Sequence, residues 1–354
     1  MKKRGASTLK IAGTYIGTVV GAGFATGQEI LQFFARFGAP GLLGIAIAAA
    51  LFVFFGYWVM ALGRKLHARS HLEVIRYASG RVSGKIMDAL ITFFLFGSFT
   101  AMVAGTGALF RQQLGLSNLL GNLLMGALTA ITVLTGVEGV INSISIIVPF
   151  LLVSVICISI HSILYAPPNF SAAMNMEQNP LIANWFLSAI LYVSYNMMLS
   201  VSVLGALGTN ARNQKALKNG AIWGGLGLGL SSALIFFALC GNRSGISNLE
   251  IPMIYIAGEI SPLMQVVYAM VLIGEIYSTA VGSLFGFASR IAAGKKTPHQ
   301  ERTVVIGATI AALLASQFGF TNIVKYFFPV EGLCGLFLLF SLLRVCIRQR
   351  RFRL

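Results

Sequence analysis

Long apolar stretches recur along the whole chain and limit its possible folds more than any other feature. A helix needs about 20 mostly apolar residues to cross a bilayer. By that criterion the sequence predicts ten spanning helices, near residues 9–37, 40–63, 86–110, 118–135, 142–164, 185–207, 220–240, 263–290, 303–318 and 326–345. Only 10% of the residues are charged and the mean hydropathy is +0.82, far above the range of soluble domains. We therefore expect an all-α polytopic protein embedded in the lipid bilayer.

Basic residues follow the topology that these ten spans imply. The formal net charge is +16, and 22 of the 26 lysines and arginines fall in the termini and loops on the N-terminal side of the predicted bundle. An excess of basic residues marks the cytoplasmic side of membrane proteins. The sequence thus predicts a multi-pass protein of the cell's inner (plasma) membrane with both termini in the cytoplasm. No basic face interleaved with aromatic residues suggests a nucleic-acid partner.

The first apolar run is unusually polar in its middle, where residues 16–30 read IGTVVGAGFATGQEI. The run extends to Phe37, which is too long for a signal peptide, so we expect it to be retained as the first helix. Its glycines form two small-xxx-small pairs that could serve helix packing alone. Packing does not explain Gln28 and Glu29, because a charged residue at membrane depth costs at least about 2.5 kcal/mol.

An interrupted helix explains both features of this run. An unwound turn frees backbone carbonyls before the break and backbone N–H groups after it. The carbonyls near Val19 to Ala22 would then face a cation, and the N–H groups near Gly23 to Thr26 would face an anionic group such as a carboxylate. No P-loop sequence follows, so nucleotide binding is not expected.

Transporters with one broken helix often contain a second one at the matching position of a structural repeat. Ten helices divide into two halves of five, and an odd number of spans gives the halves inverted topology. We predict one transmembrane domain over 1–354, with repeats at 8–165 and 184–346, in which the sixth span is broken at SYNMMLS. The alternative is a continuous helix whose serines hydrogen-bond to their own backbone.

Two polar connections are expected to carry short helices. HARSHLEVIRYASGRVSGK, between the second and third spans, should lie along the cytoplasmic interface. His67 and His71 within it are interpreted as a solvated face, since a metal pair would need a third ligand. LEIPMIYIAGEISP, before the eighth span, is too short to cross and suggests a folded external cap.

The segment TYIGTVVGAGFATGQEILQFFARFGAPGLLGI resembles the first helix of the amino acid–polyamine–organocation and neurotransmitter:sodium symporter superfamily, the LeuT fold. Within that superfamily the chain is most similar to the YkvI-type bacterial membrane proteins. The resemblance covers nearly the whole chain, because the helix count, the cytoplasmic termini and both short connections agree with it.

The resemblance implies a sodium site between the unwound part of the first helix and a Ser/Thr pair in the eighth. Here the ligands would be the carbonyls of Val19 or Val20 and of Ala22 or Gly23, with the hydroxyls of Ser278 and Thr279. Hard oxygen donors suit such a cation. The alternative is that both hydroxyls bond to their own helix.

Coupling to protons stays open at this point. The fifth span has no lysine where proton-coupled relatives can place one, which favours sodium. Glu275 is an unusual carboxylate one turn before Ser278, and it could join the cation site, neutralise a substrate amine or bind a proton.

The function predicted from the sequence is secondary active transport of a small organic solute such as an amino acid, driven by sodium and needing no other cofactor. The alternatives are a proton-coupled carrier or exchanger using Glu29 or Glu275, and a channel or solute-binding sensor on a transporter scaffold. An enzyme is not expected, because no set of acidic, His or Ser catalytic residues can be assembled. The predicted solute-binding residues are Gly21, Ala22, Gly23, Phe24, Thr26, Gln28, Glu29, Tyr192, Tyr195 and Asn196.

Overall fold

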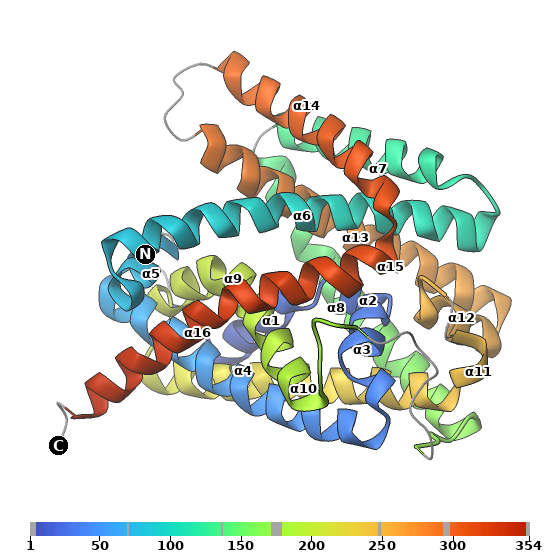
Figure 1. Ribbon diagram of the computed structural model, residues 1–354, viewed down its shortest axis with the longest axis horizontal. Coiled ribbons are helices and arrows are strands. Elements are labelled where there is room, and N and C mark those ends of the chain that lie inside the picture. The colour runs from blue at the N-terminus through green and yellow to red at the C-terminus, as the bar shows by residue number, and fades with distance from the viewer. Residues whose placement is uncertain are drawn as a thin grey trace.

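The computed structural model describes residues 5–68, 71–135, 137–170, 179–246, 249–292 and 298–351. Almost all of these residues are helical (Figure 1), and the extended pairing found among them is a single bridge between Ala6 and Ala211. This agrees with the predicted all-α class.

Helical elements occupy every segment that the sequence predicts to span. They are α1 (Thr8–Val19), α2 (Ala22–Ala25), α3 (Gln28–Phe33), η1 (Ala35–Phe37), α4 (Ala39–Leu66), α5 (His71–Ser79), α6 (Arg81–Leu114), α7 (Asn118–Leu134), α8 (Val137–Tyr165), α9 (Trp185–Thr209), α10 (Gln214–Gly241), α11 (Arg243–Ile246), α12 (Pro252–Ile260), α13 (Pro262–Ala292), α14 (Pro298–Ala315), η2 (Ser316–Phe318), α15 (Phe320–Asn322), η3 (Ile323–Phe327) and α16 (Phe328–Arg351). The short helices α5 and α12 lie in the two connections where short helices are expected, and α11 precedes the second of them.

Five of these segments are long and apolar enough to cross a membrane by length and composition, all within the described residues. A sixth is counted if the two parts of α9, Trp185–Val201 and Val203–Thr209, form one span with a bend of 60°. Asn118–Leu134, Phe150–Tyr165 and Arg302–Phe318 are apolar but shorter. The first predicted span consists of several short pieces, so it does not qualify as one long helix.

The break in the first segment lies at Val20 and Gly21. Val20 has φ −70° and ψ 112°, and Gly21 has φ −123° and ψ −174°, so both are extended between α1 and α2. A second irregularity follows at Gly27, whose φ of +80° lies in the left-handed region that favours glycine. The chain therefore passes through the segment as short helices separated by residues that cannot continue a helix.

The sixth predicted span differs from the prediction, because α9 is helical through SYNMMLS. Ser200 Oγ donates to Asn196 O at 2.7 Å, and Asn196 Nδ2 donates to Tyr192 O at 2.9 Å. These are bonds to the helix's own carbonyls, which is the alternative weighed for this sequence. The break predicted at Ser194 to Ser200 is therefore not confirmed there, and the bend of 60° in α9 follows this stretch, between Val201 and Val203.

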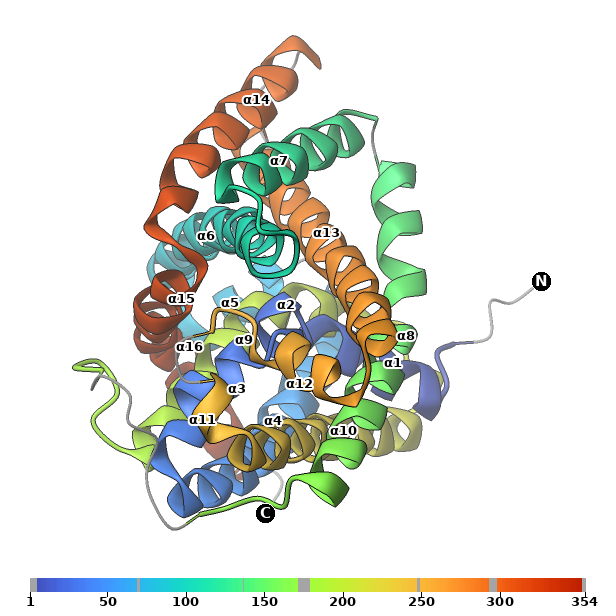
Figure 2. The same cartoon turned by 90° about the vertical axis from the view of Figure 1, so that its right-hand side faces the viewer.

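The helices form two packed groups with the interrupted segment between them (Figure 2). In one group α4 packs against α9 and α10, and α1 packs against α10. In the other α6 packs against α7 and α13, and α14 packs against α7. The short helix α2 contacts α13, so the break at Val20 and Gly21 faces the second group.

Candidate solute and cation site

The hydrogen bonds around the break show which backbone groups already have partners. The Val20 N–H donates to Ile16 O at 2.8 Å and closes α1. On the other side the Thr26 N–H donates to Ala22 O at 2.8 Å, and Thr26 Oγ1 donates to Gly23 O at 2.9 Å. Of the four carbonyls predicted to bind a cation, those of Ala22 and Gly23 thus each already accept one hydrogen bond. A carbonyl oxygen has two lone pairs, so each retains capacity for a second partner.

Helix α13 holds the interrupted segment at two points. Tyr268 OH donates to Ala25 O at 2.5 Å. One face of Gly21 is turned toward Thr279, because a Cβ added at this glycine would lie 3.9 Å from Thr279 Oγ1. The fold therefore brings the break and the predicted hydroxyl of Thr279 together, although they are far apart in the sequence.

The other predicted groups of α13 lie on the same stretch of helix. Ser278 Oγ donates to Glu275 O at 3.0 Å, so this hydroxyl bonds to its own helix. Thr279 Oγ1 lies 3.5 Å from Glu275 Oε1, and Glu275 is only 2% exposed. Its second oxygen, Oε2, has no hydrogen-bond partner among the described residues. Thr279, rather than Ser278, is the hydroxyl oriented toward the break.

Glu29 folds back from α3 over the backbone of α2. It is buried, and the Tyr195 hydroxyl on α9 donates a hydrogen bond to its Oε2. A Cβ at Gly23 would lie 2.1 Å from Glu29 Oε1, so only glycine leaves room for this carboxyl group. The predicted residues Gly23, Glu29 and Tyr195 therefore form one contact cluster.

Gln28 points elsewhere, although it neighbours Glu29 in the sequence. Its Nε2 donates to Thr321 Oγ1 at 3.2 Å, on α15, while its backbone N–H donates to Thr26 Oγ1 at 3.3 Å. Its Oε1 has no partner among the described residues. Consecutive helical residues face different directions, so Gln28 lies against α15 while Glu29 lies against α9.

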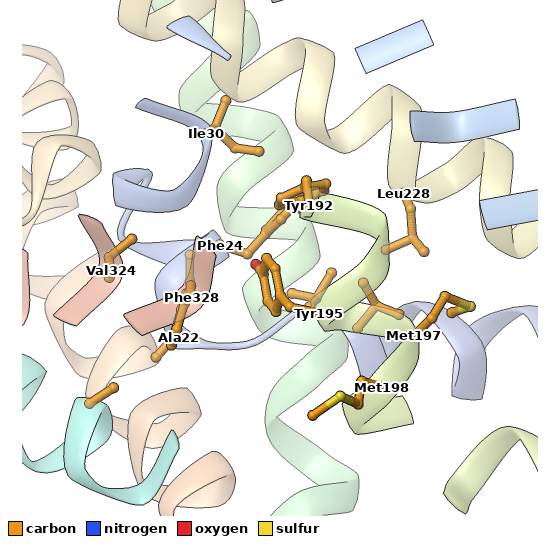
Figure 3. Close-up of a cluster of buried hydrophobic side chains, with 14 of the residues drawn as sticks. Ala22, Phe24, Ile30, Tyr192, Tyr195, Met197, Met198, Leu228, Val324 and Phe328 are labelled. Atoms are coloured by element: carbon orange, nitrogen blue, oxygen red, sulfur yellow. The ribbon is translucent and has the colours of Figure 1, made fainter. Parts of the chain in front are cut away.

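Aromatic side chains surround the Glu29 cluster. Figure 3 shows Phe24 of α2 beside Tyr192 and Tyr195 of α9, with Phe328 of α16 close by. The Tyr195 and Phe328 rings stack with centroids 5.2 Å apart, and Phe33 lies 5.5 Å from Tyr192 by ring centroids. All five rings are buried. Asn196 lies next to Tyr195 but bonds within α9, so it joins the cluster only as part of the helix.

Sequence reasoning missed Glu331, a fully buried glutamate at the first turn of α16. It lies in FPVEGLCGLF, inside the last predicted span. The rule that singled out Glu29 and Glu275 applies to it equally, because an ionisable residue at membrane depth is a candidate functional group.

The fold is that of the LeuT-type transporters. The inward-facing structure of Mhp1 matches with a TM-score of 0.65 and 16% identity, covering 94% of this chain and 76% of that chain. MhsT in complex with L-phenylalanine matches with a TM-score of 0.66 and 18% identity over 94% and 88% of the two chains. A Na⁺-coupled sialic acid symporter matches with a TM-score of 0.64 and 15% identity over 94% and 79%. As expected, these structures are membrane transporters and not enzymes.

In sequence, the chain is homologous to two proteins of Bacillus subtilis (strain 168). It is 29% identical over 353 residues to the uncharacterized membrane protein YkvI, covering 99% of each chain. It is also 29% identical over 332 residues to the protein YyaD, covering 93% of this chain and 94% of that one. No protein-family model matches the chain. The resemblance to YkvI-type proteins with a LeuT fold is thereby confirmed.

Proposed function

We propose that this protein is a secondary active transporter that couples movement of a small organic solute, such as an amino acid, to sodium. The observation that supports it most is the interrupted helix at Val20 and Gly21 with Thr279 of α13 beside it. A broken helix at the centre of a transporter supplies backbone groups that side chains of neighbouring helices complete into an ion site. The sodium ligands would be the carbonyls of the break and the Thr279 hydroxyl, with Ser278 completing the set after rotation of its side chain.

In this proposal the solute lies beside the cation, against the first half-helices and α9. Its contacts would come from the backbone of Gly21 to Thr26 and from Glu29, Tyr195 and the rings around them. The relatives with this fold support the class of function: one is a Na⁺-coupled symporter and another was solved with L-phenylalanine bound.

The proposal includes the topology. Ten spans would form two inverted repeats, 8–165 and 184–346, with both termini in the cytoplasm of a cell whose plasma membrane holds the protein. The shorter helices α7, α8 and α14 would cross as well, and the first span would cross as the set of pieces from α1 to η1. The positive-inside distribution of lysine and arginine supports this orientation.

The test of the sodium site is thermal stability of the purified protein in detergent, in sodium chloride against choline chloride at equal ionic strength. A ligand that binds only the folded state raises its stability by an amount set by its concentration relative to Kd. We expect sodium to stabilise the wild type and Thr279→Ala to need roughly tenfold more sodium, a loss of about 1.4 kcal/mol.

Two variants sharpen the sodium test. Thr279→Ser keeps the hydroxyl and should keep the sodium response. Thr309→Ala removes a buried hydroxyl that bonds to Val305 O within α14, far along the chain from the break, and should leave the response unchanged. An unchanged sodium response in Thr279→Ala would eliminate the proposed site.

A second candidate is proton coupling through Glu29 or Glu275. Both carboxyl groups are buried, and one oxygen of Glu275 has no partner among the described residues. If sodium and choline give equal stability while the effect of a solute varies with pH, proton coupling replaces sodium coupling.

A further inference from the structure

A cavity of about 330 Å³ lies where α1 and α10 begin. The segment before α1 pairs with the segment before α10: the Ala6 N–H donates to Asn210 O at 2.8 Å, and the Arg212 N–H donates to Ala6 O at 3.0 Å. Arg64 of α4 holds the same segment, because its Nη1 donates to Ala211 O at 3.0 Å. These hydrogen bonds fix the two walls of the cavity side by side.

Polar side chains form most of the lining of this cavity, and two of them are positively charged. They come from the first residues of α1 and α10 and from the residues just before these helices, and are Ser7, Thr8, Arg212, Asn213, Lys215 and Asn219. Among the described residues, no carboxyl group lines the cavity. The stretches of sequence that contain its walls, 1–28 and 178–249, have no aspartate or glutamate. Cations without a nearby acid attract an anion, and arginine with hydroxyl and amide donors suits the oxygens of a phosphate.

An exposed apolar strip leads away from the cavity along α10. Trp223, Leu226 and Leu230 follow Asn219 at intervals of four, three and four residues, which places them on one face of the helix. Their side chains are 63%, 49% and 63% exposed, and Leu9, which also lines the cavity, is 83% exposed. Tryptophan is enriched where spanning helices cross the membrane–water interface. The cavity therefore joins a positively charged end to an apolar surface, which matches a phospholipid better than a free phosphate.

We propose that this cavity binds the phosphate of an anionic phospholipid, with the acyl chains of the lipid on the α10 strip of Trp223, Leu226 and Leu230. Arg212 and Lys215 bind the phosphate oxygens. The lipid site is separate from the solute and cation site, because none of its lining residues belongs to the break or to α13. Helix α1 is the half-helix before the break, so a lipid bound here connects it to α10 and stabilises their contact.

The test compares lipids that have equal chains and different headgroups. Dioctanoyl phosphatidylglycerol and dioctanoyl phosphatidylcholine are titrated into the purified full-length protein in detergent, and thermal unfolding gives an apparent Kd for each. We expect phosphatidylglycerol to bind roughly tenfold more tightly, because the choline headgroup adds a positive charge beside two cations.

Two further probes distinguish a lipid from a soluble phosphate. Glycerol phosphate and inorganic phosphate carry the anionic group without acyl chains. We expect each to bind more weakly than phosphatidylglycerol by at least about tenfold, because buried acyl carbons add affinity.

Variants assign the phosphate and the chains to their residues. Arg212→Gln and Lys215→Gln should each raise the apparent Kd of phosphatidylglycerol roughly tenfold. Lys218→Gln removes the same charge from an exposed position on α10 that does not line the cavity, so it should leave this Kd unchanged. Trp223→Ala should weaken phosphatidylglycerol binding and leave glycerol phosphate binding unchanged. All four side chains are exposed, so we expect the variants to fold.

Several results would overturn the inference. They are equal affinity for the two lipids, no stabilisation by either of them, and equal losses in Lys218→Gln and Lys215→Gln. Binding of inorganic phosphate as tightly as phosphatidylglycerol would also overturn it and would assign the cavity to a soluble anion. None of these measurements uses sodium or a transported solute, so the proposed function stands or fails independently of them.

Discussion

The first segment and α9 can be compared directly, because an inverted repeat would place them at matching positions of the two halves of the chain. The first segment leaves the helix at Val20 and Gly21 and again near Gly27, whereas α9 stays helical from Trp185 to Thr209 and changes direction by 60° between Val201 and Val203. Both contain buried polar residues, so polarity does not distinguish them. Glycine does, because it adopts backbone conformations and close contacts that serine and asparagine do not. The first segment therefore contributes free backbone groups near the predicted site, and α9 contributes side chains such as Tyr195.

The largest expected effect comes from filling the contact between Gly23 and Glu29. Gly23→Leu would displace the Glu29 carboxyl group, because even a Cβ at this position would lie 2.1 Å from Oε1. We expect the protein to fold and solute binding to be abolished, removing a stabilisation of about 2.7 kcal/mol at a hundred times Kd. Thermal unfolding with and without the amino acid that binds best measures it.

Gly13→Leu is the matched control for this variant. A Cβ at Gly13 meets no atom within 4 Å, so the substitution adds the same side chain to α1 without displacing a neighbour. Solute binding should survive in Gly13→Leu. Normal binding in Gly23→Leu would mean that the glycines of this segment serve packing only.

A smaller effect is expected at Gly27, where the backbone conformation itself requires glycine. Gly27→Ala places a side chain at φ +80°, which costs roughly 1–2 kcal/mol for a left-handed residue. A Cβ here would also approach Met253 Cγ on α12 to 2.8 Å. We expect a lower unfolding midpoint with solute binding retained.

Gly115→Ala separates the two causes at Gly27. Gly115 has φ +64° and no atom within 4 Å of an added Cβ, so it reports the backbone cost alone. The destabilisation of Gly27→Ala should exceed that of Gly115→Ala by the cost of the Met253 contact. Equal or smaller destabilisation at Gly27 would contradict close packing of Met253 on α12 against the first segment.

The smallest effect is expected in α9, at Ser200. Its hydroxyl bonds to Asn196 O in the same helix, so Ser200→Ala removes a hydrogen bond within α9. We expect a loss of stability of no more than about 1 kcal/mol, the net contribution of one hydrogen bond, and no change in solute affinity. A tenfold loss of affinity in Ser200→Ala would show that α9 opens at this position and would erase the contrast with the first segment.

Much of the fold could be predicted from the sequence because a spanning helix requires a continuous run of apolar residues. The run at 263–290 corresponds to α13, Pro262–Ala292, and the run at 220–240 lies within α10, Gln214–Gly241. The interruption of the first run could be located because four glycines and two polar residues stand together there. The break expected at SYNMMLS is not found there, because serine and asparagine side chains can hydrogen-bond to carbonyls of their own helix. The presence of these residues therefore does not reveal whether the backbone opens.

The site could be predicted only in part. Residue type indicated that Glu29, Tyr195 and Thr279 belong near the break, but side-chain direction depends on packing between segments that are distant in the sequence. The sequence therefore could not show that Gln28 turns to Thr321 while Glu29 turns to Tyr195. Glu331 was overlooked although its type and depth were visible, because nothing in its own segment marks a broken helix.

The central claim is that solute movement depends on sodium bound at the interrupted helix. The most direct measurement is uptake, into liposomes containing the purified protein, of the amino acid that stabilises the protein most. Uptake is compared under an inward sodium gradient and with equal sodium on both sides at constant pH. The account predicts transient accumulation above the external concentration only with the gradient. Equal uptake in both conditions, with accumulation only under an imposed proton gradient, would contradict it.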